Sequence, residues 1–259
     1  MSEILLTGAA GRIGTSLRSS LPDCGWTLRC FDRTGGDGIT TGDVTSPADL
    51  DAVVPGVDAI VHLAGQPTEA PWPVIRDANI EGVVQLFEAA RRHGVRRVVY
   101  ASSNHAVGFT PVDSELPADT PPRPDTLYGV SKVFGEALAR YYVERYDLQV
   151  ACLRIGTFAA EPPDVRALST WLSPADCARL VDACLRSDEL DYALVWGVSA
   201  NTRRVWSLAA GHALGYVPVD DAEQFAATLP DAQPYPSDGF TGGGFTTDGF
   251  GIDEVAARW

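Results

Sequence analysis

Short apolar runs alternate with longer segments of helical periodicity along most of the chain. Strands are predicted for the apolar runs at 4–7, 26–31, 57–63, 97–102 and 148–155. Helices are predicted for the intervening segments at 12–20, 47–54, 75–93 and 127–146. Strands that alternate with helices form a parallel sheet covered on both faces, and such sheets bind ligands at the carboxyl ends of their strands. The pattern predicts an α/β protein with a Rossmann-type doubly wound parallel sheet.

The chain of 259 residues has the length of one large domain. Residues 1–230 are expected to form it, with a small substrate lobe interleaved from about residue 156 and containing a helix at 174–185 and a strand at 193–196. Residues 231–259 form a C-terminal tail rich in Gly, Pro and Phe. The tail is either mobile or an ordered strap, and we favour a mobile tail, although Phe240, Phe245 and Phe250 recur at five-residue spacing.

The net charge and the cysteine pattern argue against several kinds of binding partner: nucleic acids, membrane surfaces and metal ions. Lys and Arg number 20 and Asp and Glu number 34, which gives a net charge of −14. This charge repels nucleic acids and anionic membrane surfaces, so neither is expected as a partner. The five cysteines lack C-x-x-C spacing, so no metal site is expected. Without a signal-peptide pattern or a long apolar stretch, a cytoplasmic location is the expectation.

A glycine-rich turn follows the first predicted strand and opens the first predicted helix. Such glycines let the backbone turn tightly and approach a pyrophosphate, which the free amides and the positive end of the helix dipole then bind. The spacing is G-x-x-G-x-x-G, although a glycine turn by itself can simply be a turn. The candidate cofactor residues here are Gly8, Gly11, Arg12, Ile13 and Gly14.

The ends of the following strands supply further candidate cofactor residues. Asp32 ends the second strand, where a carboxylate can bind the ribose hydroxyls and repel a 2′-phosphate, so NAD is favoured over NADP. Arg33 could instead bind a 2′-phosphate, and Asp32 could be a solvated ion. Candidates beside the adenine are Asp43 and Val44, and small or apolar residues close to the dinucleotide are Leu63, Ala64 and Gly65.

Tyr128 and Lys132 lie four residues apart, on one face of a predicted helix. A phenol with an ordinary pKa of about 10 must lose about 3 pKa units to act as a base near neutrality. The adjacent positive charges of the lysine and of a bound oxidised nicotinamide can together supply that shift. Lys132 is the single lysine among the 20 basic residues. Arginine stands wherever either cation would serve, so this position is interpreted as one that needs a compact ammonium. The alternative is a surface tyrosine beside a solvated lysine.

Ser103, Asn104 and His105 close the fifth predicted strand and therefore face the same crevice. Ser103 or Asn104 can hydrogen-bond the hydroxyl being oxidised, and His105 can orient another hydroxyl. The serine could equally cap the strand end, and the histidine could be structural.

These motifs together resemble the extended short-chain dehydrogenase/reductase family. The segments at 101–107, 128–135, 153–156, 166–173 and 195–201 further resemble its uronate dehydrogenase branch. The resemblance implies NAD-dependent oxidation of the anomeric carbon of D-glucuronate or D-galacturonate to an aldarolactone, in a homo-oligomer, with Tyr128 as base and Lys132 as its partner and ribose ligand. It also implies that Phe158 contacts the cofactor and that the sugar acid binds Gln66, Ser103, Asn104, His105, Tyr128, Thr157 and Arg166.

One position departs from the pattern of that branch, and one assignment has an alternative. Pro67 stands where a serine is expected, which puts the sugar selectivity in doubt. Arg166 can form a bidentate pair with a substrate carboxylate, or a surface ion pair with Glu161 or Asp164.

Three other functions stay open. The same scaffold supports an NAD-dependent glucose-6-phosphate dehydrogenase or a sugar-nucleotide epimerase, although an epimerase is expected to need a larger C-terminal lobe. A non-catalytic dinucleotide sensor is a third alternative. Retention of Tyr128 and Lys132 speaks against the sensor.

Overall fold

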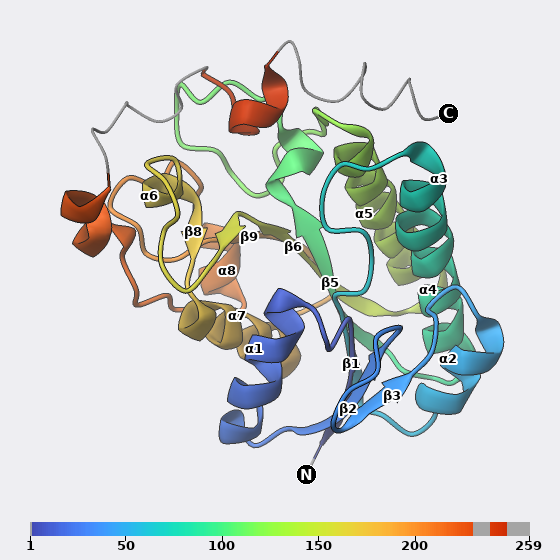
Figure 1. Cartoon of the computed structure of the whole chain (residues 1–259). Coiled ribbons are helices and arrows are strands. Elements are labelled where there is room, and N and C mark those ends of the chain that lie inside the picture. Colours follow the sequence, from blue (N-terminus) through green and yellow to red (C-terminus); the bar gives the residue numbers. More distant parts are fainter. Residues whose placement is uncertain (1, 230–238, 248–259) are drawn as a thin grey trace.

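A computed structural model describes residues 2–229 and 239–247 of the chain. In these residues a seven-stranded sheet forms the centre of the molecule, and all of its strand pairs are parallel. Figure 1 shows the sheet with helices on both sides, so the predicted doubly wound α/β fold is confirmed. The strands lie in the order β3 (Ile39–Thr41), β2 (Thr27–Asp32), β1 (Glu3–Thr7), β4 (Ala59–His62), β5 (Arg97–Ser103), β6 (Gln149–Ile155) and β9 (Tyr192–Gly197).

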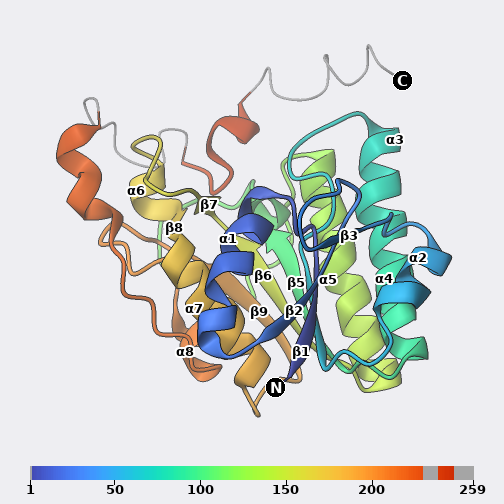
Figure 2. The same ribbon diagram turned by 60° about the horizontal axis from the view of Figure 1, so that its bottom comes forward.

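The side chains of β1 show why the sheet is covered twice. Successive side chains of a strand point to opposite faces. Ile4 and Leu6 pack into one apolar core with Leu17 of α1, whereas Leu5 packs into a second core with Leu50 of α2. All five side chains are fully buried. Figure 2 shows the two helical layers, with α1, α7 and α8 on one side of the sheet and α2, α3, α4 and α5 on the other.

Several helices begin at a residue whose side-chain oxygen accepts a hydrogen bond from a first-turn amide. Ser46, Thr126 and Ser173 cap α2, α5 and α7 in this way. The predicted helix at 127–146 coincides with α5, which carries the candidate base. The bounds are α1 (Arg12–Ser20), α2 (Pro47–Val53), α3 (Trp72–Ile75), α4 (Gly82–Arg92), α5 (Leu127–Tyr146), α6 (Ala167–Thr170), α7 (Pro174–Arg186) and α8 (Ala209–Ala213).

The helix predicted at 75–93 differs from the observed one. The helical segment starts earlier, at Trp72, and contains a π-helical stretch, η2 (Arg76–Glu81), between α3 and α4. A π-helical turn holds an extra residue, so it breaks the regular side-chain period and re-aims one side chain. Here Asn79 is buried and bonds both backbone groups of Gln66: its Oδ1 accepts from the amide at 2.7 Å and its Nδ2 donates to the carbonyl at 3.0 Å.

The chain after β6 forms smaller elements beside the carboxyl end of the sheet. Strand β7 (Thr157–Phe158) pairs in parallel with β8 (Trp171–Leu172). Among the residues that the structure describes, the 3-10 helices are η1 (Pro22–Cys24), η3 (Asn104–Val107), η4 (Ala222–Thr228) and η5 (Gly243–Thr246).

The C-terminal segment from Gly239 to Thr247, here called the strap, packs over this end of the molecule (Figure 1). Its backbone amides at Thr241 and Gly242 donate to the carbonyls of Thr110 and Gly108, at 3.0 and 2.8 Å. The mobile tail that we favoured is therefore wrong for these residues, because ordinary backbone hydrogen bonds hold them in place. Phe250 lies outside the described residues.

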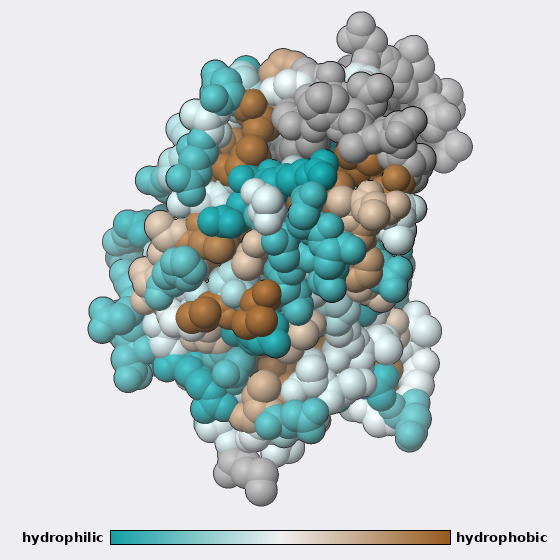
Figure 3. Space-filling view, turned by 90° about the vertical axis from the view of Figure 1, so that its left-hand side faces the viewer, coloured by the Kyte–Doolittle hydropathy of each residue, from teal (hydrophilic) through white to brown (hydrophobic). Residues whose placement is uncertain are grey.

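The surface mixes hydrophilic area with small, separate apolar patches, as Figure 3 shows for the face on the left of Figure 1. Within residues 2–229 and 239–247, none of the helices combines the length and the apolar character needed to cross a membrane.

Candidate active site

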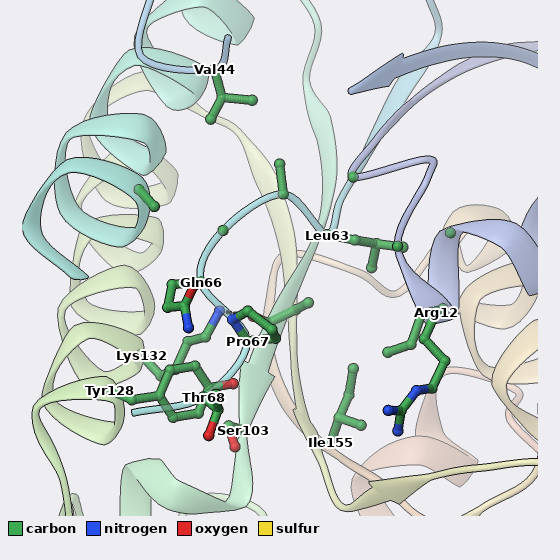
Figure 4. A pocket seen from close by; sticks show the side chains of 18 of the residues that line it. Arg12, Val44, Leu63, Gln66, Pro67, Thr68, Ser103, Tyr128, Lys132 and Ile155 are labelled. Atoms are coloured by element: carbon green, nitrogen blue, oxygen red, sulfur yellow. Dashed lines mark hydrogen bonds between the residues drawn. The ribbon is translucent and has the colours of Figure 1, made fainter. Parts of the chain in front are cut away.

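A cleft of about 1280 Å³ opens at the carboxyl ends of the central strands. It is where a doubly wound sheet binds ligands, because the helices of the two faces diverge there. Figure 4 shows Gln66, Ser103, Tyr128 and Lys132 gathered at one end, with Arg12 across the cleft. The sequence-predicted residues that line the cleft are Gly8, Gly11, Arg12, Ile13, Gly14, Asp32, Arg33, Asp43, Val44, Leu63, Ala64, Gly65, Gln66, Ser103, Asn104, His105, Tyr128, Lys132 and Phe158.

The glycine-rich turn brings the backbone of β1, β4 and α1 into close contact. Gly8 has φ = +72°, and a Cβ there would stand 2.7 Å from the Ala64 nitrogen. A Cβ on Gly14 would stand 2.2 Å from the Gly8 carbonyl oxygen. Gly11, at the N-terminus of α1, offers no side chain to the first-turn amides. The helix therefore presents amides that can bind an anion, as a dinucleotide pyrophosphate requires.

Asp32 lies at the end of β2 with each carboxylate oxygen on a backbone amide. Oδ2 accepts from the Ala10 amide at 3.0 Å and Oδ1 from the Thr34 amide at 2.8 Å. A carboxylate oxygen has a second lone pair, so both oxygens can still accept from ribose hydroxyls. Arg33 lines the same end of the cleft. The residues at this end fit an adenine dinucleotide.

Tyr128 lies in the first turn of α5 and is 7% exposed. The Ser103 hydroxyl lies beside its phenol (Figure 4), where it can donate to a phenolate and so lower the pKa of Tyr128. Lys132 extends from the next turn, where its Nζ donates to the Ala101 carbonyl at 2.9 Å and lies 5.4 Å from the centroid of the Tyr128 ring. The phenol, the hydroxyl and the ammonium therefore meet at the end of β5, as the sequence predicts.

The protonation equilibria at this end differ from the expectation in one respect. Burial raises the pKa of Tyr128 to about 12, although the hydrogen bond from Ser103 opposes this, and burial lowers the pKa of Lys132 to about 8. The expected downward shift of the phenol is therefore not produced by Lys132. Its Nζ lies over the ring and bonds a carbonyl, so the desolvation of the phenolate outweighs its charge.

Asn104 and His105 are held by residues from elsewhere in the chain. Asn104 Nδ2 donates to the Thr241 carbonyl of the strap at 3.3 Å. His105 Nδ1 is bonded to Asp125 Oδ2 at 2.8 Å, and its ring stacks on Phe245 with centroids 4.2 Å apart. The strap therefore covers the part of the cleft that the sequence assigns to the sugar.

Two predicted substrate residues do not line the cleft. Thr157 Oγ1 is bonded to Thr170 Oγ1 at 2.8 Å and accepts from Arg166 Nη1 at 3.5 Å. Arg166 Nη2 donates to the Thr241 carbonyl at 2.9 Å, the carbonyl that also accepts from Asn104. Neither residue is part of the cleft lining, and the Thr241 carbonyl of the strap joins Arg166 to Asn104.

Several residues of the site escape sequence reasoning. Asn79 fixes the Gln66 backbone from the π-helical stretch, which the apolar pattern did not reveal. Glu69 Oε2 accepts a hydrogen bond from the Tyr128 amide at 2.7 Å, so this carboxylate lies at the N-terminus of α5. The path of the loop that carries Glu69 decides this contact, and the sequence does not reveal that path. Phe245 lines the cleft, and the regular spacing of phenylalanines in the C-terminal segment was the available signal.

Residues 4–190 match the NAD dependent epimerase/dehydratase family. A uronate dehydrogenase of Pseudomonas syringae pv. tomato is 41% identical over 96% of this chain and 94% of the relative. An NAD-dependent glucose-6-phosphate dehydrogenase of Haloferax volcanii is 36% identical over 86% of this chain and 95% of the relative.

The solved structures give a consistent result. The crystal structure of a mutant uronate dehydrogenase from Agrobacterium tumefaciens, complexed with NAD, has a TM-score of 0.89 and 39% identity, covering 97% of this chain and 100% of that one. The resemblance inferred from the motifs is thus confirmed over nearly the whole length. The chain belongs to the NAD dependent epimerase/dehydratase family, in the branch that contains the uronate dehydrogenases.

Proposed function

We propose that this protein is an NAD-dependent uronate dehydrogenase. It oxidises the anomeric carbon of a cyclic hexuronic acid, D-glucuronate or D-galacturonate, to the aldarolactone. The C1 hydroxyl loses a proton, and the hydrogen on C1 is transferred to NAD⁺ as hydride with the electron pair of the C1–H bond. The products are the lactone, NADH and one proton. The observation that carries the proposal is the buried Tyr128 with Ser103 and Lys132 at one end of a dinucleotide-sized cleft, in a chain 41% identical to a uronate dehydrogenase.

The cofactor end of the cleft holds the dinucleotide mainly through backbone. The first-turn amides of α1 bind the pyrophosphate, Asp32 binds the ribose hydroxyls, and Lys132 reaches the nicotinamide ribose. Val44 and Leu63 contact the apolar parts of the cofactor. NAD⁺, when bound, supplies the hydride acceptor and a positive charge that favours a phenolate beside it.

Tyr128 is the base that takes the proton of the C1 hydroxyl. Its pKa of about 12 in the buried site means that the phenolate depends on stabilisation from inside the cleft, to which the Ser103 hydroxyl contributes and a bound NAD⁺ would add its positive charge. Ser103 and Asn104 hold the reacting hydroxyl against the phenol, and most of the rate comes from this positioning. The sugar ring stays closed, which is why the product is a lactone.

The carboxylate of the sugar acid is assigned to Arg166, supported by Thr157. In a protein of net charge −14 an anionic substrate needs a local cation, and a guanidinium can bind a carboxylate with two parallel hydrogen bonds. Arg166 lies against the strap carbonyl of Thr241, so this contact rearranges when the carboxylate binds. Gln66, on the loop fixed by Asn79, completes the sugar site.

Formation of NADH with a panel of sugars tests the function. Glucuronate and galacturonate are expected to support NADH formation with NAD. Glucose 6-phosphate, L-arabinose and UDP-glucose are expected to give no NADH. Preference for glucose 6-phosphate would establish the first alternative, which the 36% identity to the Haloferax enzyme keeps in view. Conversion of UDP-glucose to its epimer would indicate an epimerase, and it needs product analysis because an epimerase returns the hydride and releases no NADH. NAD binding without any turnover would indicate a sensor.

The expected setting of the enzyme is also part of this proposal. All five cysteines are free thiols and four are buried, which is compatible with a reducing, cytoplasmic environment. Tyr141 and Tyr146 on α5 are 50% and 38% exposed, and an apolar helix face of this kind suits contact with a second copy in a homo-oligomer. Light scattering on the purified protein measures the assembly.

A further inference from the structure

Asp125 is a buried acid that the proposed mechanism does not use. It lies two residues before α5, and its side chain is completely buried. A buried carboxylate is costly unless hydrogen bonds satisfy it. It accepts one from the Thr126 hydroxyl, at 3.1 Å to Oδ1, and its Oδ2 is 2.8 Å from His105 Nδ1.

Three glycines from separate segments make room for this carboxylate. A Cβ on Gly108 or on Gly242 of the strap would stand 2.0 Å from Asp125 Oδ2. A Cβ on Gly129, in α5, would stand 3.2 Å from Oδ1. Any larger residue at the first two positions would push the acid away from His105, so the surroundings are shaped around this one contact.

The contact decides what the imidazole can offer a ligand. An ionised carboxylate only accepts hydrogen bonds, so Nδ1 must be the nitrogen that carries the proton, and the Nε2 of a neutral ring is then an acceptor. The ring cannot turn away, because one face stacks on Phe245 and Tyr128 packs against it with centroids 5.9 Å apart. Within the described residues, the side-chain hydrogen bond of His105 uses Nδ1 and leaves Nε2 for a ligand.

We propose that Asp125 is a positioning residue of the sugar site: it fixes His105 as the Nδ1–H tautomer, so that Nε2 accepts a hydrogen bond from a non-reacting hydroxyl of the substrate. The proposal rests on the proposed function, since it deepens the role of His105 in that site. A His105 that can only accept at Nε2 also orients the substrate in the site. A carboxylate or phosphate oxygen cannot donate to Nε2, so the anionic group of the substrate is directed away from His105 and toward Arg166.

The tautomer of His105 can be read without any turnover. In the full-length protein labelled with ¹⁵N-histidine, the nitrogen shifts of a neutral ring distinguish Nδ1–H from Nε2–H, and His105→Gln identifies the signal. The wild-type ring is expected to carry its proton on Nδ1. A wild-type ring protonated on Nε2, or on both nitrogens throughout the accessible alkaline range, would overturn the proposal even if no variant folded.

Asp125→Asn then tests the consequence for binding. The amide keeps the volume inside the glycine enclosure but can donate to Nδ1, which leaves Nε2 as a donor. We expect the proton of His105 to move to Nε2 and the KM for the uronate to rise about tenfold, the loss of one hydrogen bond, with kcat and the KM for NAD changed less than about threefold. An unchanged tautomer or an unchanged KM for the uronate contradicts the proposal.

Two comparisons separate this result from other causes. Asp119→Asn makes the same chemical change at an exposed position and should leave tautomer, KM and melting temperature as in the wild type. If the wild type oxidises no uronate, the proposed function fails while the nitrogen shifts still report on Asp125 and His105. A fall in kcat together with a rise in both KM values and a lower melting temperature would instead indicate a merely structural acid.

Discussion

The two ends of the cleft are built in different ways. The nucleotide end consists of backbone from β1, β2, β4 and α1, close in sequence and shaped by glycines such as Gly8 and Gly14. The sugar end consists of side chains from β5, η3, α5 and the strap, which the chain brings together from distant positions. Backbone recognition suits a cofactor shared by a family, whereas side chains can be exchanged to suit a substrate. The two ends should therefore respond differently to mutation.

The largest effect is expected from Tyr128→Phe. Removal of the phenol oxygen takes away the base and leaves the ring, so kcat should fall about 1000-fold while the dissociation constant for NAD stays within about twofold. Steady-state kinetics and NAD titration measure both. Tyr192→Phe removes a phenol oxygen that lies outside the cleft and donates to the Glu136 carbonyl, so it is the matched control. Residual activity above about a tenth of the wild type would remove Tyr128 from the role of base.

Arg166→Ala addresses the sugar end alone. Loss of the guanidinium should raise the KM for the uronate about 100-fold and leave the KM for NAD unchanged, because a charged, bidentate contact to the carboxylate is lost. Arg96→Ala, at the amino end of β5 and away from the cleft, is the control for loss of an arginine. If both KM values rise together, Arg166 acts on the fold or the strap and the carboxylate binds elsewhere.

Gly14→Ala addresses the nucleotide end alone. Its Cβ would stand 2.2 Å from a backbone oxygen, so we expect a loss of about 2 kcal/mol in the free energy of unfolding and about tenfold weaker NAD binding. Urea denaturation and NAD titration measure these, with Ser19→Ala in the same helix as control. An equal rise in the KM for the uronate would show that the two ends are not independent.

His62→Gln tests the buried strand β4, which lies in the sheet below the cleft. His62 is 1% exposed, its Nδ1 bonds Thr7 Oγ1 at 2.7 Å, and burial lowers its pKa from 6.5 to about 3. Between these pH values the unfolded chain binds more protons than the native one, so this contribution to stability is present above pH 6.5 and is lost as the pH falls toward 3. From about pH 7 to about pH 5 the wild type should lose about 2 kcal/mol that His62→Gln does not lose.

Urea unfolding of both proteins at the two pH values measures the difference. His212→Gln changes an exposed histidine and should keep the acid sensitivity of the wild type. Equal sensitivity in His62→Gln and in the wild type would show that His62 is already protonated in the native state, or that it is accessible to water.

The nucleotide end was easier to predict from the sequence than the sugar end, because its residues are close in sequence and those of the sugar end are not. The glycine turn, Asp32 and the pair Tyr128 and Lys132 could be predicted because each motif lies within one strand–helix unit, where local spacing already fixes the geometry. The contacts of Arg166 could not, because they run to Thr241, 75 residues away. The role of the strap was misjudged for residues 239–247, since composition shows that a segment lacks a regular core but not that its backbone finds partners.

The sequence by itself determined the doubly wound sheet, the position of the cleft and the presence of a phenol and an ammonium in it, since apolar periodicity and short motifs act over a few residues. Only the tertiary structure decided which acid holds His105, how the strap covers the sugar end, and that burial raises the pKa of Tyr128. Hydrogen bonds between distant segments and the loss of water around a group depend on the whole packed chain, which no local pattern contains.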